Sequence, residues 1–183
     1  RRKEGLHFVP EERLGRGAVP TLSLALNTLL TRTEAVHRAT GWIDMHRVRE
    51  MTDEIIRRFQ VKAGGAAAAA KSLSGGNLQK FIVGREISAN PRVLIVAQPT
   101  WGVDVGAAAQ IRSELLALRD AGCALLVVSE ELEELFEISD RLVVIAQGRL
   151  SPSVPTREAT VEQIGEWMSG LWPQTTGAVH AQA

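Results

Sequence analysis

Residues 73–79 (LSGGNLQ) contain the groups best suited to bind an anion. Ser74, Gly75 and Gly76 stand directly before a helical pattern. The first N–H groups of a helix have no partner within it, and the helix dipole favours negative charge at that end. Two glycines let another surface approach these N–H groups, and the Ser74 hydroxyl adds a donor. The corner is therefore a candidate phosphate site, although Ser-Gly-Gly alone is also typical of a flexible turn with a serine cap.

A second candidate stretch follows a predicted buried strand at residues 93–96. The strand ends at Ala97 and Gln98, and a loop then leads to Asp104 and a further helical pattern. Ala97 has no oxygen for a metal shell, and Gln98 cannot accept a proton as a carboxylate does. These residues fit an ordinary strand end better than a catalytic centre. The four histidines, at positions 7, 37, 46 and 180, are scattered and offer no substitute metal or acid–base site.

The N-terminal half of the chain must position the first of these stretches. A short apolar run predicts a strand at residues 6–9, and a charged loop follows up to Pro20. Ser23 is a suitable N-cap for a short helix that carries Leu24, Leu26, Leu29 and Leu30. A longer helix is predicted over 42–60. Its apolar stripe, expected to pack in the core, consists of Trp42, Met45, Val48, Met51, Ile55 and Phe59.

The period of the apolar residues changes after Pro91. Continuous apolar runs at 93–96, 124–128 and 142–146 predict strands buried on both faces, as in a parallel sheet covered by helices. Helical patterns at 107–119 and 131–138 alternate with them. Gln147-Gly148 predicts a tight turn into a further short strand, and a last amphipathic helix is predicted over 160–168.

Composition narrows the class of protein. The chain has 183 residues, 45% of them apolar, and its 21 basic and 21 acidic residues give a net charge of zero. A nucleic-acid or membrane-surface binder normally carries a basic excess, so we expect neither partner. No apolar run reaches the roughly 20 residues that span a bilayer, so we expect no membrane insertion. A single cysteine, Cys123, suits a reducing compartment.

The order of these motifs resembles that of the ATP-binding cassette (ABC) family. LSGGN at 73–77 is similar to the family signature LSGGQ. The Asn variant and its continuation to residue 87 resemble the second, C-terminal cassette of the ATPase subunits that drive importers of simple sugars and nucleosides. Three further stretches match in order and spacing up to about residue 152: PEERLGRG at 10–17, PTWGVDVGA at 99–107, and VVSEELEELFEISDRLVVIAQGRL at 127–150.

The resemblance implies an α/β fold: a partial P-loop NTPase (RecA-like) core with a mostly parallel sheet, plus an inserted helical subdomain. Residues 1–20 would form the first strand and a Q-loop-like segment, and 21–90 the helical subdomain with the signature. Residues 91–152 would complete the core with the Walker B, D-loop and switch regions. A C-terminal helix at 153–172 and a disordered tail at 173–183 would follow.

The chain departs from the family at the positions that handle nucleotide. It has no G-x-x-x-x-G-K-[ST] phosphate loop. In the family this loop precedes the first strand, so we expect it upstream of Arg1, in an N-terminally truncated cassette that alone binds ATP and Mg²⁺ weakly or not at all. The resemblance aligns Ala97 and Gln98 with the Walker B Asp and Glu, Glu130 with the switch histidine, and Glu11 with the Q-loop glutamine. It therefore implies a degenerate site and leaves ATPase activity of this half open.

The same resemblance implies what the intact residues do. In the family, two cassettes clamp two nucleotides, and each signature faces the phosphate loop of the other. We therefore expect contact with a partner cassette's ATP from Leu73, Ser74, Gly75, Gly76, Asn77 and Gln79. Asp104, in the D-loop, would cross the same interface or simply cap its helix. Glu11, Glu12 and Arg13 are expected to couple to transmembrane permease subunits, with the protein cytoplasmic and peripheral on the inner face of the plasma membrane.

Two other functions fit parts of the pattern. A non-catalytic regulatory or scaffold cassette could close over a partner's ATP without hydrolysis, and Ala97, Gln98 and Glu130 favour it for this half. Chromosome-maintenance and DNA-repair ATPases share the Ser-Gly-Gly signature. The short helical insertion, where those proteins carry long coiled-coil arms, and the neutral charge weigh against them. The transported molecule stays open between nucleosides and simple sugars.

Overall fold

The computed structural model describes residues 2–32 and 42–173. The tail predicted to be disordered lies, from residue 174 on, outside the described residues, as do His37 and His180. The chain forms two compact units, Arg1–Glu130 and Glu131–Ala183, and each is described by itself.

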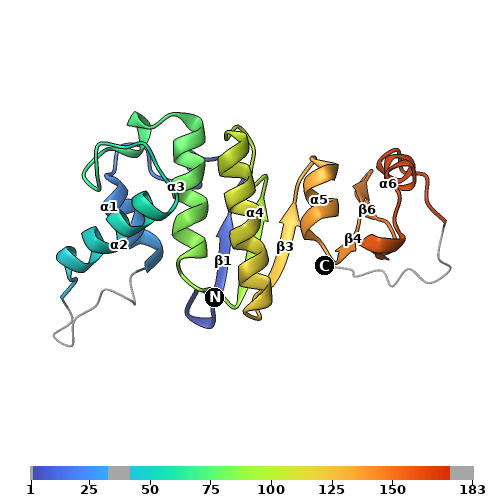
Figure 1. Cartoon of the computed structure of the whole chain (residues 1–183), viewed down its shortest axis with the longest axis horizontal. Helices are drawn as coiled ribbons and strands as arrows, with labels where there is room; N and C mark the ends of the chain where they lie inside the picture. The colour runs from blue at the N-terminus through green and yellow to red at the C-terminus, as the bar shows by residue number, and fades with distance from the viewer. Residues whose placement is uncertain (1, 33–41, 174–183) are drawn as a thin grey trace. The chain divides into compact units, whose positions relative to one another are not determined.

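The first unit is built on a three-stranded parallel sheet in the order β1-β2-β3 (Figure 1). The strands are β1 (Leu6–Val9), β2 (Val93–Ala97) and β3 (Ala124–Val128). In register, Phe8 lies beside Ile95, and Ile95 beside Leu126. The three strands lie where the sequence predicts them, and the α/β class with a parallel sheet is confirmed.

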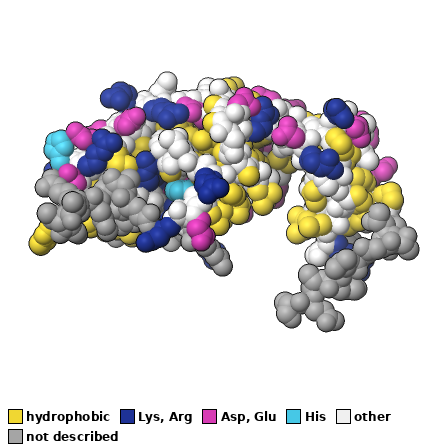
Figure 2. Space-filling model, turned by 90° about the horizontal axis from the view of Figure 1, so that it is seen from below, with side chains coloured by type: hydrophobic (Ala, Val, Ile, Leu, Met, Phe, Trp, Pro, Cys, Tyr) yellow, Lys and Arg dark blue, Asp and Glu magenta, His cyan; other side chains and the backbone are white. Residues whose placement is uncertain are grey.

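Helices α3 (Gly75–Ile87) and α4 (Val105–Asp120) pack on this sheet, α3 against β1 and α4 against β3 (Figure 1). The strand residues that alternate toward the buried side include Val9, Leu94 and Val96. Phe8, Val93, Leu126 and Val128 are exposed instead. The expectation of strands buried on both faces is therefore wrong for this part of the chain. Exposed hydrophobic side chains form groups on its surface (Figure 2).

Helices α1 (Leu24–Arg32) and α2 (Met45–Arg58) pack against each other, and α2 also packs against α3. The predicted Ser23 cap is confirmed, since its Oγ accepts from the Leu26 N–H at 3.2 Å. Helix α1 buries Leu24, Ala25, Asn27 and Thr28, while Leu26 and Leu30 are exposed. The expectation that Trp42 packs in the core is wrong, because Trp42 is 76% exposed and α2 begins only at Met45, after its Asp44 cap.

The second unit contains α5 (Leu132–Ile138), α6 (Val161–Met168) and two short antiparallel ladders. β4 (Arg141–Leu142) pairs with β7 (Val154–Pro155), and β5 (Ile145–Ala146) with β6 (Arg149–Leu150). Short 3₁₀ helices complete the two units: η1 (Arg2–Glu4), η3 (Ala70–Ser72) and η4 (Thr156–Glu158).

The single strand predicted over 142–146 is wrong, because the chain leaves one ladder for the other at Val144. The Val144 N–H donates to the Ser151 Oγ at 2.9 Å, and its carbonyl accepts from the Ser151 N–H at 2.8 Å. The turn at Gln147-Gly148 is confirmed, with φ of 51° and 72° as a two-residue hairpin requires. Within residues 2–32 and 42–173, no helix has both the length and the apolar character to cross a membrane.

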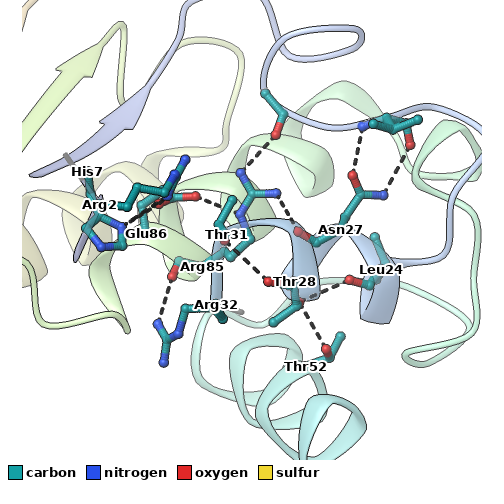
Figure 3. Close-up of polar contacts among 12 residues, drawn as sticks. Arg2, His7, Leu24, Asn27, Thr28, Thr31, Arg32, Thr52, Arg85 and Glu86 are labelled. Atoms are coloured by element: carbon teal, nitrogen blue, oxygen red, sulfur yellow. Dashed lines mark hydrogen bonds and ion pairs between the residues drawn. The ribbon is translucent and has the colours of Figure 1, made fainter. Parts of the chain in front are cut away.

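A buried ionic network joins α3 to β1 and α1 (Figure 3). Glu86 receives hydrogen bonds from Arg85 Nε at 2.8 Å, His7 Nδ1 at 2.7 Å and Arg2 at 2.9 Å. The Arg85 guanidinium also donates to the carbonyl of Asn27 at 3.2 Å and to that of Gly17 at 2.9 Å. Because Glu86 is completely buried, these partners are what makes its charge tolerable.

The same partners set the pKa of Glu86. Burial alone would raise it, but the hydrogen bond from His7 and the charges of Arg85 and Arg2 outweigh burial and lower the pKa from 4.5 to about 2. Because the pKa is lowered on folding, the stabilisation is fully present above about pH 4.5 and is lost as the pH falls toward 2.

We therefore predict that Glu86→Gln lowers the free energy of unfolding by about 3 kcal/mol at pH 7, and that the deficit shrinks between pH 4.5 and pH 2. Urea unfolding across this range measures it. Glu54→Gln, at an exposed position on α2, is the control and should change the free energy of unfolding little at any pH in this range. A Glu86→Gln deficit that stays constant with pH contradicts the assignment.

Candidate functional site

The N-terminus of α3 forms the corner that the sequence predicts. Ser74 is the N-cap residue, and its Oγ accepts from the Asn77 N–H at 3.4 Å and from Asn77 Nδ2 at 2.9 Å. The Asn77 Oδ1 in turn accepts from the Lys62 N–H at 2.8 Å. The N–H groups of Gly75 and Gly76, in the first turn, have no acceptor within the helix. The corner is thus a capped helix start and not a flexible turn.

A pocket of about 330 Å³ opens at this corner. It is lined by Lys62, Ser74, Gly76, Asn77, Lys80, Gly102 and Asp104. Two lysines give it cationic side chains that the sequence analysis missed. Lys80 lies three residues after the signature and could have been found there, whereas nothing in the sequence marks Lys62.

Asp104 uses its two carboxylate oxygens differently. Oδ1 accepts from the Ala107 N–H at 2.9 Å and so caps α4, while Oδ2 lies 3.4 Å from Lys80 Nζ. The hydrogen bond from Ala107, followed by the ion pair with Lys80, lowers the pKa of Asp104. The helix-cap role, one of two alternatives from the sequence, is present, and the same side chain also lines the pocket.

Gly76 lies against the loop that follows β2. A Cβ added to Gly76 would lie 2.8 Å from the carbonyl oxygen of Gly102, closer than real Cβ contacts come. A Cβ on Gly75 would meet only the guanidinium end of Arg13, also at 2.8 Å. Gly76 is therefore required for the close approach between α3 and the loop at residues 98–104.

Gln79 faces inward from the first turns of α3. Only 2% of it is exposed, and its Nε2 donates to the carbonyls of Gln98 and Pro99, both at 3.0 Å. Its Oε1 accepts from Arg13 Nε at 3.1 Å. Gln79 was predicted as a nucleotide contact, and the structure engages its amide with these three residues. It therefore positions the corner relative to the strand end.

In the Glu11–Arg13 segment the two glutamates are exposed, whereas Arg13 contacts Trp101. Glu11 and Glu12 are exposed, and Glu12 pairs with Arg16 at 2.9 Å. The Arg13 guanidinium lies 5.1 Å from the centroid of the Trp101 ring and donates to the Trp101 carbonyl. Leu73, half-buried, ends η3 just before the corner.

The end of β2 lacks metal-binding chemistry. Gln98 has a left-handed φ of 50°, and its N–H donates to the carbonyl of Val128 at 2.7 Å. Its side-chain Oε1 accepts from Ser129 Oγ at 3.4 Å. Glu130 is exposed. Ala97 has no oxygen to offer a metal ion. Across the described ranges, no group of three or more His, Cys, Asp or Glu residues could hold one.

Comparison with known proteins decides what kind of fold this is. No family model matches the sequence. The fold matches an ATP-binding cassette solved as a dimer with ADP and Pi (TM-score 0.71, 19% identity, 86% of this chain and 66% of that chain). It also matches the ATP-binding subunit of an ABC transporter (TM-score 0.72, 15% identity, 91% and 69%).

Curated proteins match this chain at higher sequence identity than the solved structures do. The ribose import ATP-binding protein RbsA 1 of Rubrobacter xylanophilus is 37% identical over 89% of this chain and 33% of that protein. The nucleoside import ATP-binding protein NupA of Lactococcus lactis is 38% identical over 92% and 33%. The guanosine import ATP-binding protein NupO of Bacillus subtilis is 37% identical over 96% and 34%.

The chain has the fold of an ATP-binding cassette, and its sequence is similar to that of import ATP-binding proteins. The predicted ABC resemblance and P-loop NTPase fold class are thereby confirmed. The chain spans about a third of the length of the curated relatives it matches. Within this cassette, the signature corner, the loop at 98–104 and the Glu11–Arg13 segment converge on one end of α3.

We predict that Gly76→Ala lowers the free energy of unfolding of the cassette by about 1–3 kcal/mol, because the new methyl group meets backbone. Gly75→Ala meets only a movable side chain and should change it by less than about 1 kcal/mol. Urea denaturation of the two variants measures the difference. Equal losses would show that the corner does not depend on the approach of Gly76 to Gly102.

Proposed function

We propose that this cassette is part of the ATPase of an ABC importer and completes a nucleotide site whose phosphates a second cassette holds. The observation that carries the proposal is the start of α3, where Ser74, Gly76 and Asn77 line a pocket together with Lys62, Lys80 and Asp104. Such a helix start favours anions through its dipole and its free donors. Ser74, Asn77 and the half-buried Leu73 complete the signature.

We propose that the partner cassette binds and activates the nucleotide that the signature of this chain contacts. Ala97 has no oxygen for a Mg²⁺ shell, Gln98 is no carboxylate base, and Glu130 would repel a triphosphate. ATP and Mg²⁺ are therefore bound and activated by the second cassette, while this chain contributes the signature. One hydrolytic and one degenerate site result.

The relatives support an import role for the complete protein. Those named above are import ATP-binding proteins for ribose, nucleosides and guanosine. We propose a nucleoside or simple-sugar importer, in which the cassette is cytoplasmic and docks on permease subunits at the inner face of the membrane. The exposed Glu11 and Glu12 are the residues proposed for that contact.

A regulatory cassette is the second candidate. Ala97 and Gln98 favour a subunit that closes over a partner's ATP without hydrolysis. The two functions differ in one measurable respect: the complete protein, assembled with its permease, hydrolyses ATP only in the first.

We predict that Ser74→Asp lowers the ATPase rate of the assembled full-length protein by about tenfold or more, because a carboxylate at the corner repels the phosphates. Asp and Ser are comparable helix caps, so the free energy of unfolding should change by less than about 0.5 kcal/mol. Steady-state phosphate release and urea unfolding are the two measurements.

Ser74→Asn is the matched control, since Asn caps equally well and is neutral. It removes the Ser74 hydroxyl without adding a charge, so it should lower the rate by less than Ser74→Asp does. Equal rates for Ser74→Asp and the parent protein would refute the phosphate role of the corner.

We also predict that Gln98→Asn leaves the ATPase rate of the assembled protein within about twofold of the parent. Asn tolerates the left-handed φ at this position and only shortens the side chain. A loss of about a hundredfold with unchanged unfolding would instead assign Gln98 to the hydrolytic chemistry.

A further inference from the structure

We propose that Arg13 is a positioning residue that links the exposed loop at residues 11–18 to the signature corner. This inference rests on the proposed function, because it concerns the geometry of the same corner. It assigns Arg13 a role inside the cassette, whereas the sequence alone suggested a contact with the permease.

The Arg13 guanidinium lies between three segments that are far apart in the sequence. Its Nε donates to Gln79 Oε1 at 3.1 Å, and its terminal nitrogen donates to the Trp101 carbonyl. Its Cζ also lies over the Trp101 ring, 5.1 Å from the centroid. A Cβ on Gly75 or on Gly102 would meet this guanidinium, at 2.8 Å and 3.1 Å. The group therefore fills the space between the corner and the loop after β2.

The backbone of Arg13 is tied into the loop that carries it. Its carbonyl accepts from the Ala18 N–H at 2.7 Å, and the carbonyl of Glu12 accepts from the Gly17 N–H at 3.0 Å. Glu11, Glu12 and Arg16 on the same loop are exposed. A displacement of this loop by a bound partner would therefore move the guanidinium, and with it Gln79.

A displacement of Gln79 would affect both the signature corner and the loop that follows β2. It lies in the first turns of α3, two residues from Asn77, and its amide also holds the carbonyls of Gln98 and Pro99. A guanidinium suits this arrangement, because its fork donates in two directions while its carbon lies over a ring. A lysine keeps the charge but has neither the second directed donor nor the flat face.

The test uses the full-length protein assembled with its permease and measures kcat, KM for ATP and Tm. We expect Arg13→Ala and Arg13→Lys each to lower kcat by about tenfold or more, as small displacements of a catalytic constellation do. KM for ATP should change by less than about threefold, since the partner cassette holds the nucleotide. Arg16→Ala, on the same loop but 76% exposed at its side chain, is the matched control and should keep the parental kcat.

A double variant separates positioning from general destabilisation. If Arg13 acts through Gln79, then Arg13→Ala combined with Gln79→Ala should be no slower than the slower single variant. Additive losses, a parental kcat in Arg13→Lys, or a kcat loss that follows a fall in Tm in both Arg13 variants would each overturn the inference.

Ser74→Asp in the same assay distinguishes the two proposals. If Ser74→Asp loses activity while both Arg13 variants keep it, only the positioning role fails. If Ser74→Asp keeps its activity, the corner is not a phosphate site and the proposed function fails first.

Discussion

The buried carboxylate of Glu86 is the constraint on which the rest of the first unit depends. It lies within α3 and receives hydrogen bonds from Arg85 of the same helix, His7 of β1 and Arg2. Without these partners the carboxylate would be an unpaired charge in the interior, which is costly. Because Arg85 also holds the carbonyls of Gly17 and Asn27, the C-terminal half of α3 is fixed against the sheet and α1. Its N-terminal half is fixed by Gln79.

Under the proposed function, this arrangement divides the chemistry of a nucleotide site between two cassettes. The helix start offers N–H donors beside a pocket lined by Lys62, Lys80 and Asp104, whereas the end of β2 offers no carboxylate. The geometry within each cassette then has to be held firmly. The contacts between α3 and the loop at 98–104 meet that need, since Gly76 allows the approach and the Gln79 amide maintains it.

Much of this was predictable from the sequence because it depends on local rules. The helix start at Ser74, the strands at β1, β2 and β3, and the Gln147-Gly148 turn each follow from capping, apolar runs and turn chemistry. The exposure of Trp42, the exposed sheet face and the break at Val144 were not predictable, because tertiary packing decides them. Arg13 pairs with Gln79, and Lys62 with Asn77, across long sequence separations, so these contacts at the corner were not predictable either.

The most direct measurement is a structure of the full-length protein assembled with its permease and closed around a non-hydrolysable ATP analogue. We expect the N–H groups of Gly75 and Gly76 within about 3 Å of phosphate oxygens that the other cassette holds. A closed, nucleotide-bound assembly in which this helix start faces bulk water would contradict the account.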